Sequence, residues 1–312
     1  MTTMIVLGGN MYDDSTIEHF LKDAAAIGYE GVEIRGVGEL KDGHISQERA
    51  EQIKSLLVGY RLTPINLSLF VGNFACNTEE ENHEEFLKWE RYLDFASTIG
   101  CGMMRLNPGF QHSDEVSKED FAKAVKWFQQ CADAANSRNI RAVIEMHHGT
   151  LCDHADSSIA FVEAVGRSNV GLIMDPVNLY QVPTDYGIAT IQRLKPYLLN
   201  VHIKDIVKLQ GNQYPWAFEY SDYVPHIGRY HRVIPKQGKQ DEQYFCHRLI
   251  NQGGIDWYEV FRGLKQIGYN GYLTVESVSK PGSDLPVHTE LAQQCYNDVQ
   301  HLLSVTKSNV NV

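Results

Sequence analysis

Four apolar runs of strand length in the second half of the sequence each end near an ionisable residue that can bind a metal ion. These residues are Glu145, Asp175, His202 and Glu276. Three carboxylates that converge in a low-dielectric site could not all stay ionised without a compensating charge. A bound divalent cation is the interpretation that we favour, and separate buried ion pairs with Lys204 or Arg141 are the alternative.

The donor atoms of this set indicate which metal the site would take. Three carboxylates and one imidazole form an oxygen-rich set, which suits Mn²⁺, Mg²⁺ or Co²⁺, with Zn²⁺ and Fe²⁺ as further alternatives. We therefore expect one divalent metal ion, Mn²⁺ first. Coordination positions left open by the protein would let two substrate oxygens bind directly.

His147, Lys204 and Arg229 are further candidates for chemistry close to such a site. His147 follows Glu145 by two residues and would lie on the same side of a strand, where a neutral imidazole could act as a general base. The alternative is a structural imidazole bonded to a neighbouring loop. Lys204 could stabilise a developing enolate or pair with a ligand carboxylate. Arg229 belongs to a basic, aromatic-rich stretch that could close over a polar substrate or stay a solvated loop.

The elements that must position these residues alternate regularly along the chain. Strands are predicted at residues 4–8, 32–35, 63–70, 103–107, 141–147, 170–174, 198–203 and 272–275. Amphipathic segments of helical length lie between them, one of them capped by Ser46 and another begun near Asp256. This pattern predicts a parallel sheet closed into a single (β/α)8 TIM barrel over residues 1–312. A doubly wound open sheet is the rival, but no G-x-G-x-x-G follows any strand.

One segment interrupts the alternation. Residues 206–254, after the seventh strand, form an insertion rich in Tyr, His, Pro and Arg. Loops this long are uncommon unless they have a function, and this one leaves the strand end at which barrel enzymes place their chemistry. We expect a long loop with a role at the site, with a surface insertion or a subunit contact as the alternative.

Composition excludes several classes of protein. The 312 residues carry 28 Lys and Arg against 39 Asp and Glu, a net charge of −11, which disfavours nucleic-acid binding. No apolar run is long enough for a membrane span, and the N-terminal segment lacks the basic region of a secretory signal. Six scattered cysteines fit reduced thiols. We expect a cytoplasmic protein without a membrane partner, and leave open a homo-oligomer or a second subunit.

Several strings resemble those of a known family. The segments AVIEMHHGTL, GLIMDPVNL, NVHIKD and GYLTVES are similar to those of the xylose isomerase-like TIM barrels, also called sugar phosphate isomerases/epimerases. The resemblance runs from about residue 28 to 276. It implies that Glu145, Asp175, His202 and Glu276 bind one divalent metal. It also implies that the two glutamates are paired acid/base groups on opposite faces of a substrate, as in the ketose 3-epimerases.

The sequence departs from some members of this family. Endonuclease IV has extra histidines on earlier strands, whereas the runs here end at Phe70 and Asn107-Pro108. A nuclease is therefore not expected. Asn178 stands where the epimerases have a histidine that contacts substrate, so the resemblance implies a substrate-binding position at Asn178. The usual G-E-G-x-I-D before the last helix is Asn-Gln-Gly-Gly-Ile-Asp at residues 251–256.

These observations predict a metal-dependent isomerase or epimerase of a small sugar or keto-sugar. Glu145, Glu276 or His147 would remove a proton α to a carbonyl, and a metal-stabilised enediolate would follow. The same site would be a lyase if the enolate expelled a β-substituent. Such a lyase would be a keto-inositol or dehydroshikimate-type dehydratase, or a subunit of a 3-keto C-glycoside deglycosidase. A non-catalytic sugar-binding or scaffold barrel is the third alternative.

Overall fold

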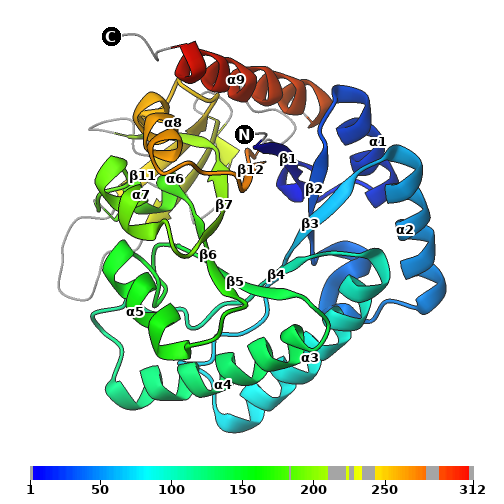
Figure 1. Ribbon diagram of the computed structural model, residues 1–312, viewed down its shortest axis with the longest axis vertical. Coiled ribbons are helices and arrows are strands. Elements are labelled where there is room, and N and C mark those ends of the chain that lie inside the picture. Colours follow the sequence, from blue (N-terminus) through cyan, green and yellow to red (C-terminus); the bar gives the residue numbers. More distant parts are fainter. Residues whose placement is uncertain are drawn as a thin grey trace.

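Eight parallel strands close into a barrel (Figure 1). The structure is a computed structural model and describes residues 3–182, 184–209, 223–224, 228–233, 243–278 and 288–308. The barrel strands are β1 (Met4–Gly8), β2 (Gly31–Arg35), β3 (Thr63–Ser68), β4 (Met103–Arg105), β5 (Arg141–Glu145), β6 (Val170–Met174), β7 (Leu198–Ile203) and β12 (Tyr272–Val275). Their order around the barrel is β1-β12-β7-β6-β5-β4-β3-β2. The predicted TIM barrel is confirmed, and the open sheet is excluded because β1 pairs with both β2 and β12.

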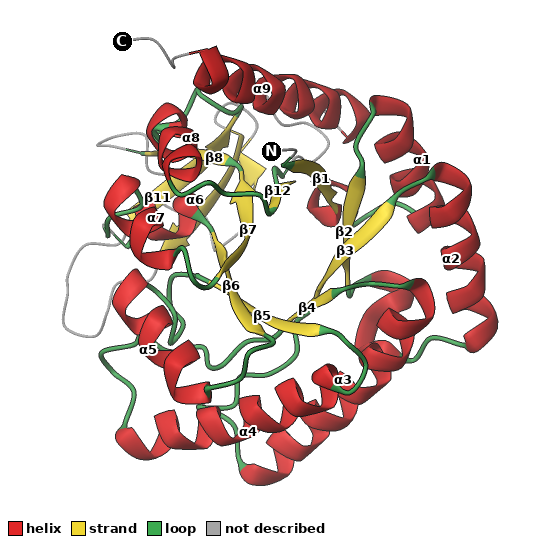
Figure 2. Cartoon of the chain, viewed as in Figure 1, coloured by secondary structure: helices red, strands yellow, loops and turns green. Residues whose placement is uncertain are grey.

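Helices form a ring outside the strands (Figure 2). They are α1 (Ile17–Ile27), α2 (Gln47–Tyr60), α3 (Glu79–Ile99), α4 (Lys118–Asn136), α5 (Ala155–Val165), α6 (Pro176–Gln181), α7 (Ile188–Leu194), α8 (Trp257–Gln266) and α9 (His288–Ser308), with 3₁₀ turns η1 (Gly9–Tyr12) and η2 (Gly38–Gly43). Side-chain oxygens cap many of the first turns. Ser46 accepts from the Arg49 N–H at the start of α2, and Asp256 accepts from the Glu259 N–H at the start of α8. Both predicted helix starts are confirmed.

Two apolar layers hold the barrel together. Outward-facing strand residues such as Ala142 and Ile144 join the large core between sheet and helices. Inward-facing residues make a smaller layer inside the barrel, which contains Val6, Ile65, Met103, Val143 and Ile173. Because side chains alternate along a strand, the residue two positions after such a core residue also points into the barrel, closer to its C-terminal mouth. The inner apolar layer therefore lies directly below the polar residues at the C-terminal mouth of the barrel.

The segment after β7 differs from the long loop that we predicted. It contains β8 (Asp205–Lys208), β9 (Tyr223–Val224), β10 (Gly228–Val233) and β11 (Gln243–Arg248), in an antiparallel sheet of order β8-β11-β10-β9. β8 starts two residues after β7 ends, and it pairs with β11 across the insertion. Phe245 of β11 packs against Tyr180 of α6, with ring centroids 6.0 Å apart. Strand pairing therefore joins the two ends of the insertion to each other, and the aromatic contact joins β11 to α6.

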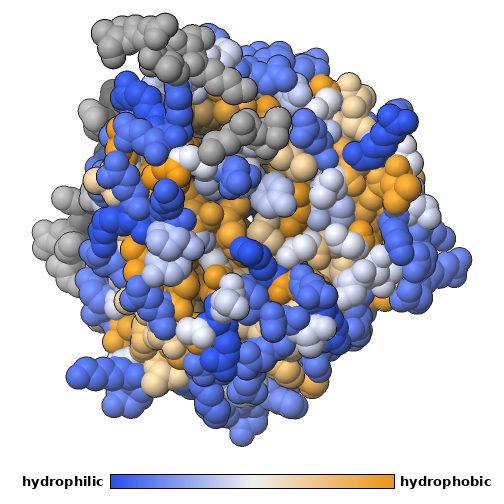
Figure 3. Space-filling model, in the orientation of Figure 1, coloured by the Kyte–Doolittle hydropathy of each residue, from blue (hydrophilic) through white to orange (hydrophobic). Residues whose placement is uncertain are grey.

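Among the described residues, few large apolar side chains are exposed, among them Val58, Phe70 and Phe110. On the face drawn in Figure 3, hydrophilic residues cover most of the outer rim, with apolar residues visible between them and near the centre. Within the described residues, no helix is both long and apolar enough to cross a membrane. The six cysteines are free, as expected, and five of them are buried.

Candidate metal centre

The four predicted ligands come together at the C-terminal ends of four neighbouring strands. One donor atom from each of Glu145, Asp175, His202 and Glu276 can be chosen so that all four lie within 4.8 Å of one another. Glu145 ends β5, Asp175 and Glu276 follow β6 and β12 directly, and His202 lies in β7. Each side chain is at most 7% exposed. The alternation of residues along each strand therefore delivers all four donors to one buried point.

His202 presents one ring nitrogen to the carboxylates of the other three ligands. Its Nδ1 lies 3.2 Å from a Glu276 oxygen, 3.3 Å from a Glu145 oxygen and 3.9 Å from an Asp175 oxygen. An octahedral ion at about 2.1 Å from its ligands needs neighbouring ligands about 3 Å apart and opposite ligands about 4 Å apart. The donor separations fall in this range, and the donor set is oxygen-rich with one imidazole. The residues present therefore fit a divalent cation.

Glu33 of β2 lies at the other ring nitrogen of His202. The two atoms, His202 Nε2 and Glu33 Oε1, are 3.3 Å apart, and both side chains are fully buried. Asn200 donates from Nδ2 to the second oxygen of Glu33. A histidine that binds a metal commonly gives its other N–H to a carboxylate, which fixes the tautomer and the orientation of the ring. The arrangement leaves Nδ1 as the ligand atom.

Asp175 and Asn178 are linked through the first turn of α6. Asp175 is the N-cap of this helix, and its Oδ1 accepts the backbone N–H groups of Val177 and Asn178. The second oxygen, Oδ2, accepts from the Asn178 side-chain amide at 2.8 Å. The same amide lies 3.2 Å from Glu145 Oε1. Asn178 therefore holds two ligand carboxylates in place from behind.

Two partly buried cations offset the negative charge of the carboxylates. Lys204 Nζ lies 2.6 Å from Asp175 Oδ2 and 2.7 Å from Glu276 Oε2. Arg105 of β4 forms an ion pair with Glu145, and it also donates to the backbone carbonyl of Leu69 through Nε and Nη2. These contacts place one positive charge on each side of the carboxylate group.

Burial and the neighbouring positive charges act in opposite directions on the carboxylate pKa values of the site. Burial alone would raise the pKa of Glu145, but the Arg105 guanidinium and the hydrogen bond from His202 outweigh it and hold this pKa well below its usual range. Glu276 behaves alike, because the charges of His202 and Lys204 lower its pKa against the effect of burial. For Asp175 burial prevails and raises the pKa, although Lys204 opposes it. The two glutamates are therefore held in the ionised form more firmly than Asp175 is.

A cavity of about 220 Å³ opens above these residues, and we call it the central cavity. Its polar lining includes Glu145, Glu276, Lys204 and His147. Its apolar lining includes Phe70 and Phe110. Both phenylalanines are more than half exposed. Asp175 and His202 are not among its lining residues and are fully buried. A small polar molecule in this cavity would meet the two glutamates before any other ligand residue.

A profile of the xylose isomerase-like TIM barrel matches residues 21–295. The chain belongs to this family. The resemblance seen in the sequence is thereby confirmed, and the cluster around His202 is a metal-binding candidate on a known barrel type.

Relatives within this family of TIM barrels are enzymes with different reactions. The chain is 24% identical to D-psicose 3-epimerase of Agrobacterium fabrum over 203 residues, which is 62% of this chain and 56% of the epimerase. It is 20% identical to inosose dehydratase of Serratia proteamaculans over 278 residues, 86% of this chain and 84% of the dehydratase. The crystal structure of the IOLI protein with a binding zinc atom has the same fold, with a TM-score of 0.75 at 17% identity, covering 98% of this chain and 100% of that one.

Of the other predicted site residues, His147 and Lys204 line the central cavity and Asn178 does not. His147 lines the central cavity, and its Nδ1 lies 2.7 Å from the carbonyl of His148. Lys204 pairs with ligand carboxylates, one of the two roles expected for it. Asn178 is not among the residues that line the cavity, and its place behind the carboxylates differs from the substrate contact that we predicted. The side chain of Arg229, in β10, lies outside the described residues.

Glu33 and Arg105 are site residues that the sequence did not reveal. Each lies on a barrel strand of the first half of the chain, between apolar neighbours, and each contacts a predicted ligand. A charged residue in the middle of an apolar strand was the available signal. In β2 this signal is Glu33 between Val32 and Ile34, both of which are buried in the outer core.

Proposed function

We propose that this protein is a divalent-metal-dependent isomerase or epimerase of a sugar or keto-sugar. Proton transfer at a carbon next to a carbonyl would be the reaction. One observation carries the proposal: of the four ligand residues, Glu145 and Glu276 line the central cavity, whereas Asp175 and His202 are buried behind them. Two ionised carboxylates that face the same small space are suited to remove a proton and to return it.

The residues of the site would divide the work between binding and proton transfer. A divalent cation held by Glu145, Asp175, His202 and Glu276 would supply Lewis-acid stabilisation of the negative charge that develops on the substrate oxygens. One glutamate would take the α-proton, and the other, after taking up a proton from solvent or from a substrate hydroxyl, would return one. Lys204, which lines the cavity beside Glu276, would add a fixed positive charge close to the developing enediolate. Return of the proton to the opposite face gives an epimer, and return to the neighbouring carbon gives an isomer.

Lyase chemistry is the second candidate, and His147 favours it. A backbone carbonyl only accepts hydrogen bonds, so the His147 Nδ1 that contacts the His148 carbonyl carries the proton. In the neutral imidazole with this tautomer, Nε2 is the basic nitrogen, and His147 lines the same cavity as both glutamates. With a third base present, one carboxyl group or Lys204 could protonate a leaving hydroxyl or alkoxide while another group removes the α-proton. The inosose dehydratase that matches 86% of this chain supports the same candidate.

One experiment separates these reactions. Purified protein is stripped of metal, loaded separately with Mn²⁺, Mg²⁺, Co²⁺ or Zn²⁺, and incubated in D₂O with ketoses, keto-inositols and 3-keto glycosides. Deuterium at the α-carbon with conserved total sugar, followed by NMR, supports the isomerase or epimerase. Release of water or of an aglycone supports the lyase instead.

The metal-stripped protein is the matched control for this experiment. We expect it to be inactive, with activity restored on reloading, and Mn²⁺ to be the best activator. Absence of exchange and of elimination with every metal and every substrate class would overturn the proposed function and favour a binding or scaffold role.

A further inference from the structure

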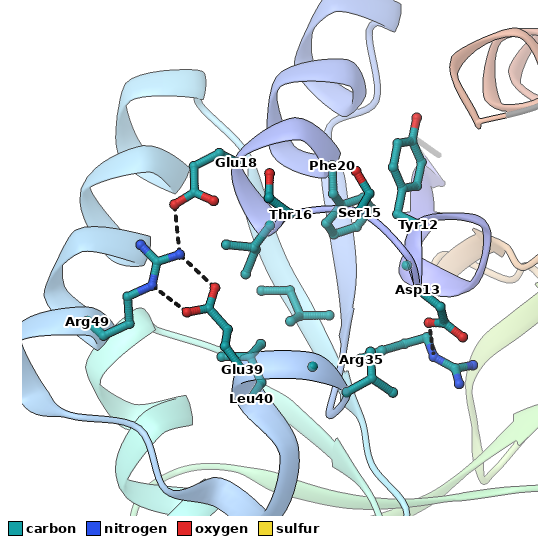
Figure 4. A pocket seen from close by; sticks show the side chains of 15 residues that line it. Tyr12, Asp13, Ser15, Thr16, Glu18, Phe20, Arg35, Glu39, Leu40 and Arg49 are labelled. Atoms are coloured by element: carbon teal, nitrogen blue, oxygen red, sulfur yellow. Dashed lines mark hydrogen bonds and ion pairs between the residues drawn. The ribbon is translucent and has the colours of Figure 1, made fainter.

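A second cavity lies beside the central cavity, between the loops that follow β1 and β2. It has a volume of about 350 Å³, larger than that of the central cavity, and we call it the outer cavity. Figure 4 shows its two sides. Asp13 and Arg35 form an ion pair on one side, and Arg49 bridges Glu18 and Glu39 on the other. Both loops leave C-terminal strand ends, so the outer cavity belongs to the same end of the barrel as the candidate metal centre.

Arg35 lies between the two cavities. Its side chain lines both of them, and its Nε lies 2.8 Å from Asp13 Oδ1. The guanidinium also lies 5.2 Å from the centre of the Phe70 ring at the mouth of the central cavity. The neighbouring residues Gly9 and Asn10 of η1 line the outer and the central cavity respectively. One side chain and one turn of backbone therefore separate the two spaces.

The lining of the outer cavity indicates the chemistry of its ligand. Phe20, Ile34 and Leu40 give it an apolar interior, and all three are buried in the core. The charges at its rim compensate one another, since Arg49 contacts two carboxylates and Arg35 contacts one. A phosphate or carboxylate group would face three acidic side chains, and a cation would face two guanidinium groups. A neutral ring with an apolar face fits this lining best.

We propose that the outer cavity binds a neutral ring substituent, of the size of a phenyl group, on the sugar whose reacting carbons occupy the central cavity. The inference rests on the proposed function, because it takes the central cavity as the site of the sugar. Its consequence is a substrate class: aryl-substituted sugars or keto-glycosides rather than free monosaccharides. Burial of the ring against Phe20, Ile34 and Leu40 would supply binding energy away from the reacting atoms.

Equilibrium binding tests this proposal without turnover. The dissociation constants of phenyl β-glucoside and methyl β-glucoside are measured by calorimetry on the Mn²⁺-loaded protein. The two probes share the sugar, so their ratio reports the ring alone. We expect the phenyl glucoside to bind at least about tenfold more tightly, since a buried phenyl group removes a large apolar area from water.

Two variants that fill the outer cavity test whether the preference for the phenyl glucoside arises there. Val37 lines this cavity, and Val37→Trp should reduce the ratio of the two dissociation constants to about one. Ser15→Trp, on the other loop, is the second occluding variant and guards against misfolding of the first. Val58→Trp is the matched control, because Val58 lies on α2, is 72% exposed and lines neither cavity. We expect it to keep the wild-type ratio.

The outcomes distinguish this proposal from the proposed function. No preference for the phenyl glucoside in the wild-type protein, including no binding of either probe, overturns the ring site. A preference that survives in both occluded variants overturns it as well. Failure of the proposed function is seen elsewhere, as absence of deuterium exchange and elimination in metal-loaded protein, and it leaves the measured preference intact.

Discussion

Glu33 contacts His202 at Nε2, with Glu33 Oε1 3.3 Å away. The three candidate ligand carboxylates lie at the other ring nitrogen, Nδ1. Both residues are buried, and they come from β7 and β2 on different sides of the closed barrel. Burial of the Glu33 carboxylate costs free energy unless a partner compensates its charge. Under the proposed function, Glu33 would orient His202 as a metal ligand.

Glu33→Gln is expected to weaken metal binding while the barrel stays folded. Glutamine keeps the shape of the side chain and removes the charge that orients His202 and raises the basicity of its ring. Outer partners of this kind typically change metal affinity by about 10- to 100-fold. Titration of Mn²⁺ into the stripped protein measures the change. Glu30→Gln, at an exposed position three residues earlier, is the control and should bind metal as the wild type does. Equal affinity in both variants would remove Glu33 from the metal site.

Glu276→Gln is expected to abolish both turnover and metal retention. The substitution removes a charged ligand and one of the two carboxylates that face the central cavity. It also leaves Lys204 with one carboxylate partner in place of two. Elemental analysis after dialysis and the exchange assay in D₂O measure the two effects. Glu84→Gln, exposed on α3, serves as the control. Wild-type turnover in the Glu276 variant would exclude this residue from the mechanism.

Arg105→Gln is expected to raise the pKa of Glu145. The Arg105 guanidinium is the main charge that holds this pKa low against the effect of burial. Without it, Glu145 takes up a proton at higher pH. The acidic limb of the profile of kcat/KM against pH therefore shifts to higher pH. Loss of a charge-assisted hydrogen bond should also lower the free energy of unfolding by about 2 kcal/mol.

The control for Arg105 is a surface arginine of the same kind. Arg138 pairs with exposed Asp94 at 3.0 Å, and Arg138→Gln should cost less than about 1 kcal/mol and leave the pH profile in place. An acidic limb that stays at the wild-type pH in the Arg105 variant would show that Glu145 does not limit the reaction.

The convergence of the four candidate ligands could be predicted because each of them is signalled locally. Alternation along a strand places Glu145 on the side of Val143, and Val143 does point into the barrel. The same argument applies at Asp175 after Ile173. Glu33 was missed because its role depends on closure of the barrel, which brings β2 close to β7 and His202. The charge of Glu33 between two apolar residues of β2 is a local signal of a polar site, but it does not identify His202 as the partner. Arg105 lies on β4, which pairs directly with β5, but arginine is not a metal ligand and its partner Glu145 is forty positions further along the chain.

The strand ends and the insertion show a second limit of local patterns. Strand β5 was predicted to continue to His147 but ends at Glu145. The N–H of His147 donates to the Cys152 carbonyl of its own loop instead of a neighbouring strand, and Thr150 caps the His147 carbonyl. The pairing of β8 with β11 joins residues about forty positions apart, so its partner could not be read from either strand alone.

Asp205 provides a test of stability that is independent of turnover. It is buried after β7, and its carboxylate accepts backbone N–H groups of Ile206, Gly253 and Ile255, which fixes the loop before α8. Burial raises the pKa of Asp205 to about 6, although these hydrogen bonds oppose the shift. The folded state therefore binds this proton more tightly than the unfolded state does, whose aspartate has a pKa of about 3.9.

The sign of the pH effect follows from this difference. A raised pKa contributes stability below about pH 4, and that contribution is lost as the pH rises through about 6, up to about 2–3 kcal/mol in all. Asp205→Asn cannot ionise, so it lacks this loss. It also gives up one acceptor to the loop. We expect the wild-type protein to exceed the variant in unfolding free energy by more at pH 4.5 than at pH 7.5. Urea denaturation of both proteins in the presence of a chelator measures the two differences, and the chelator removes any contribution from the metal site. A difference between the two proteins that is the same at both pH values would place the proton on another group.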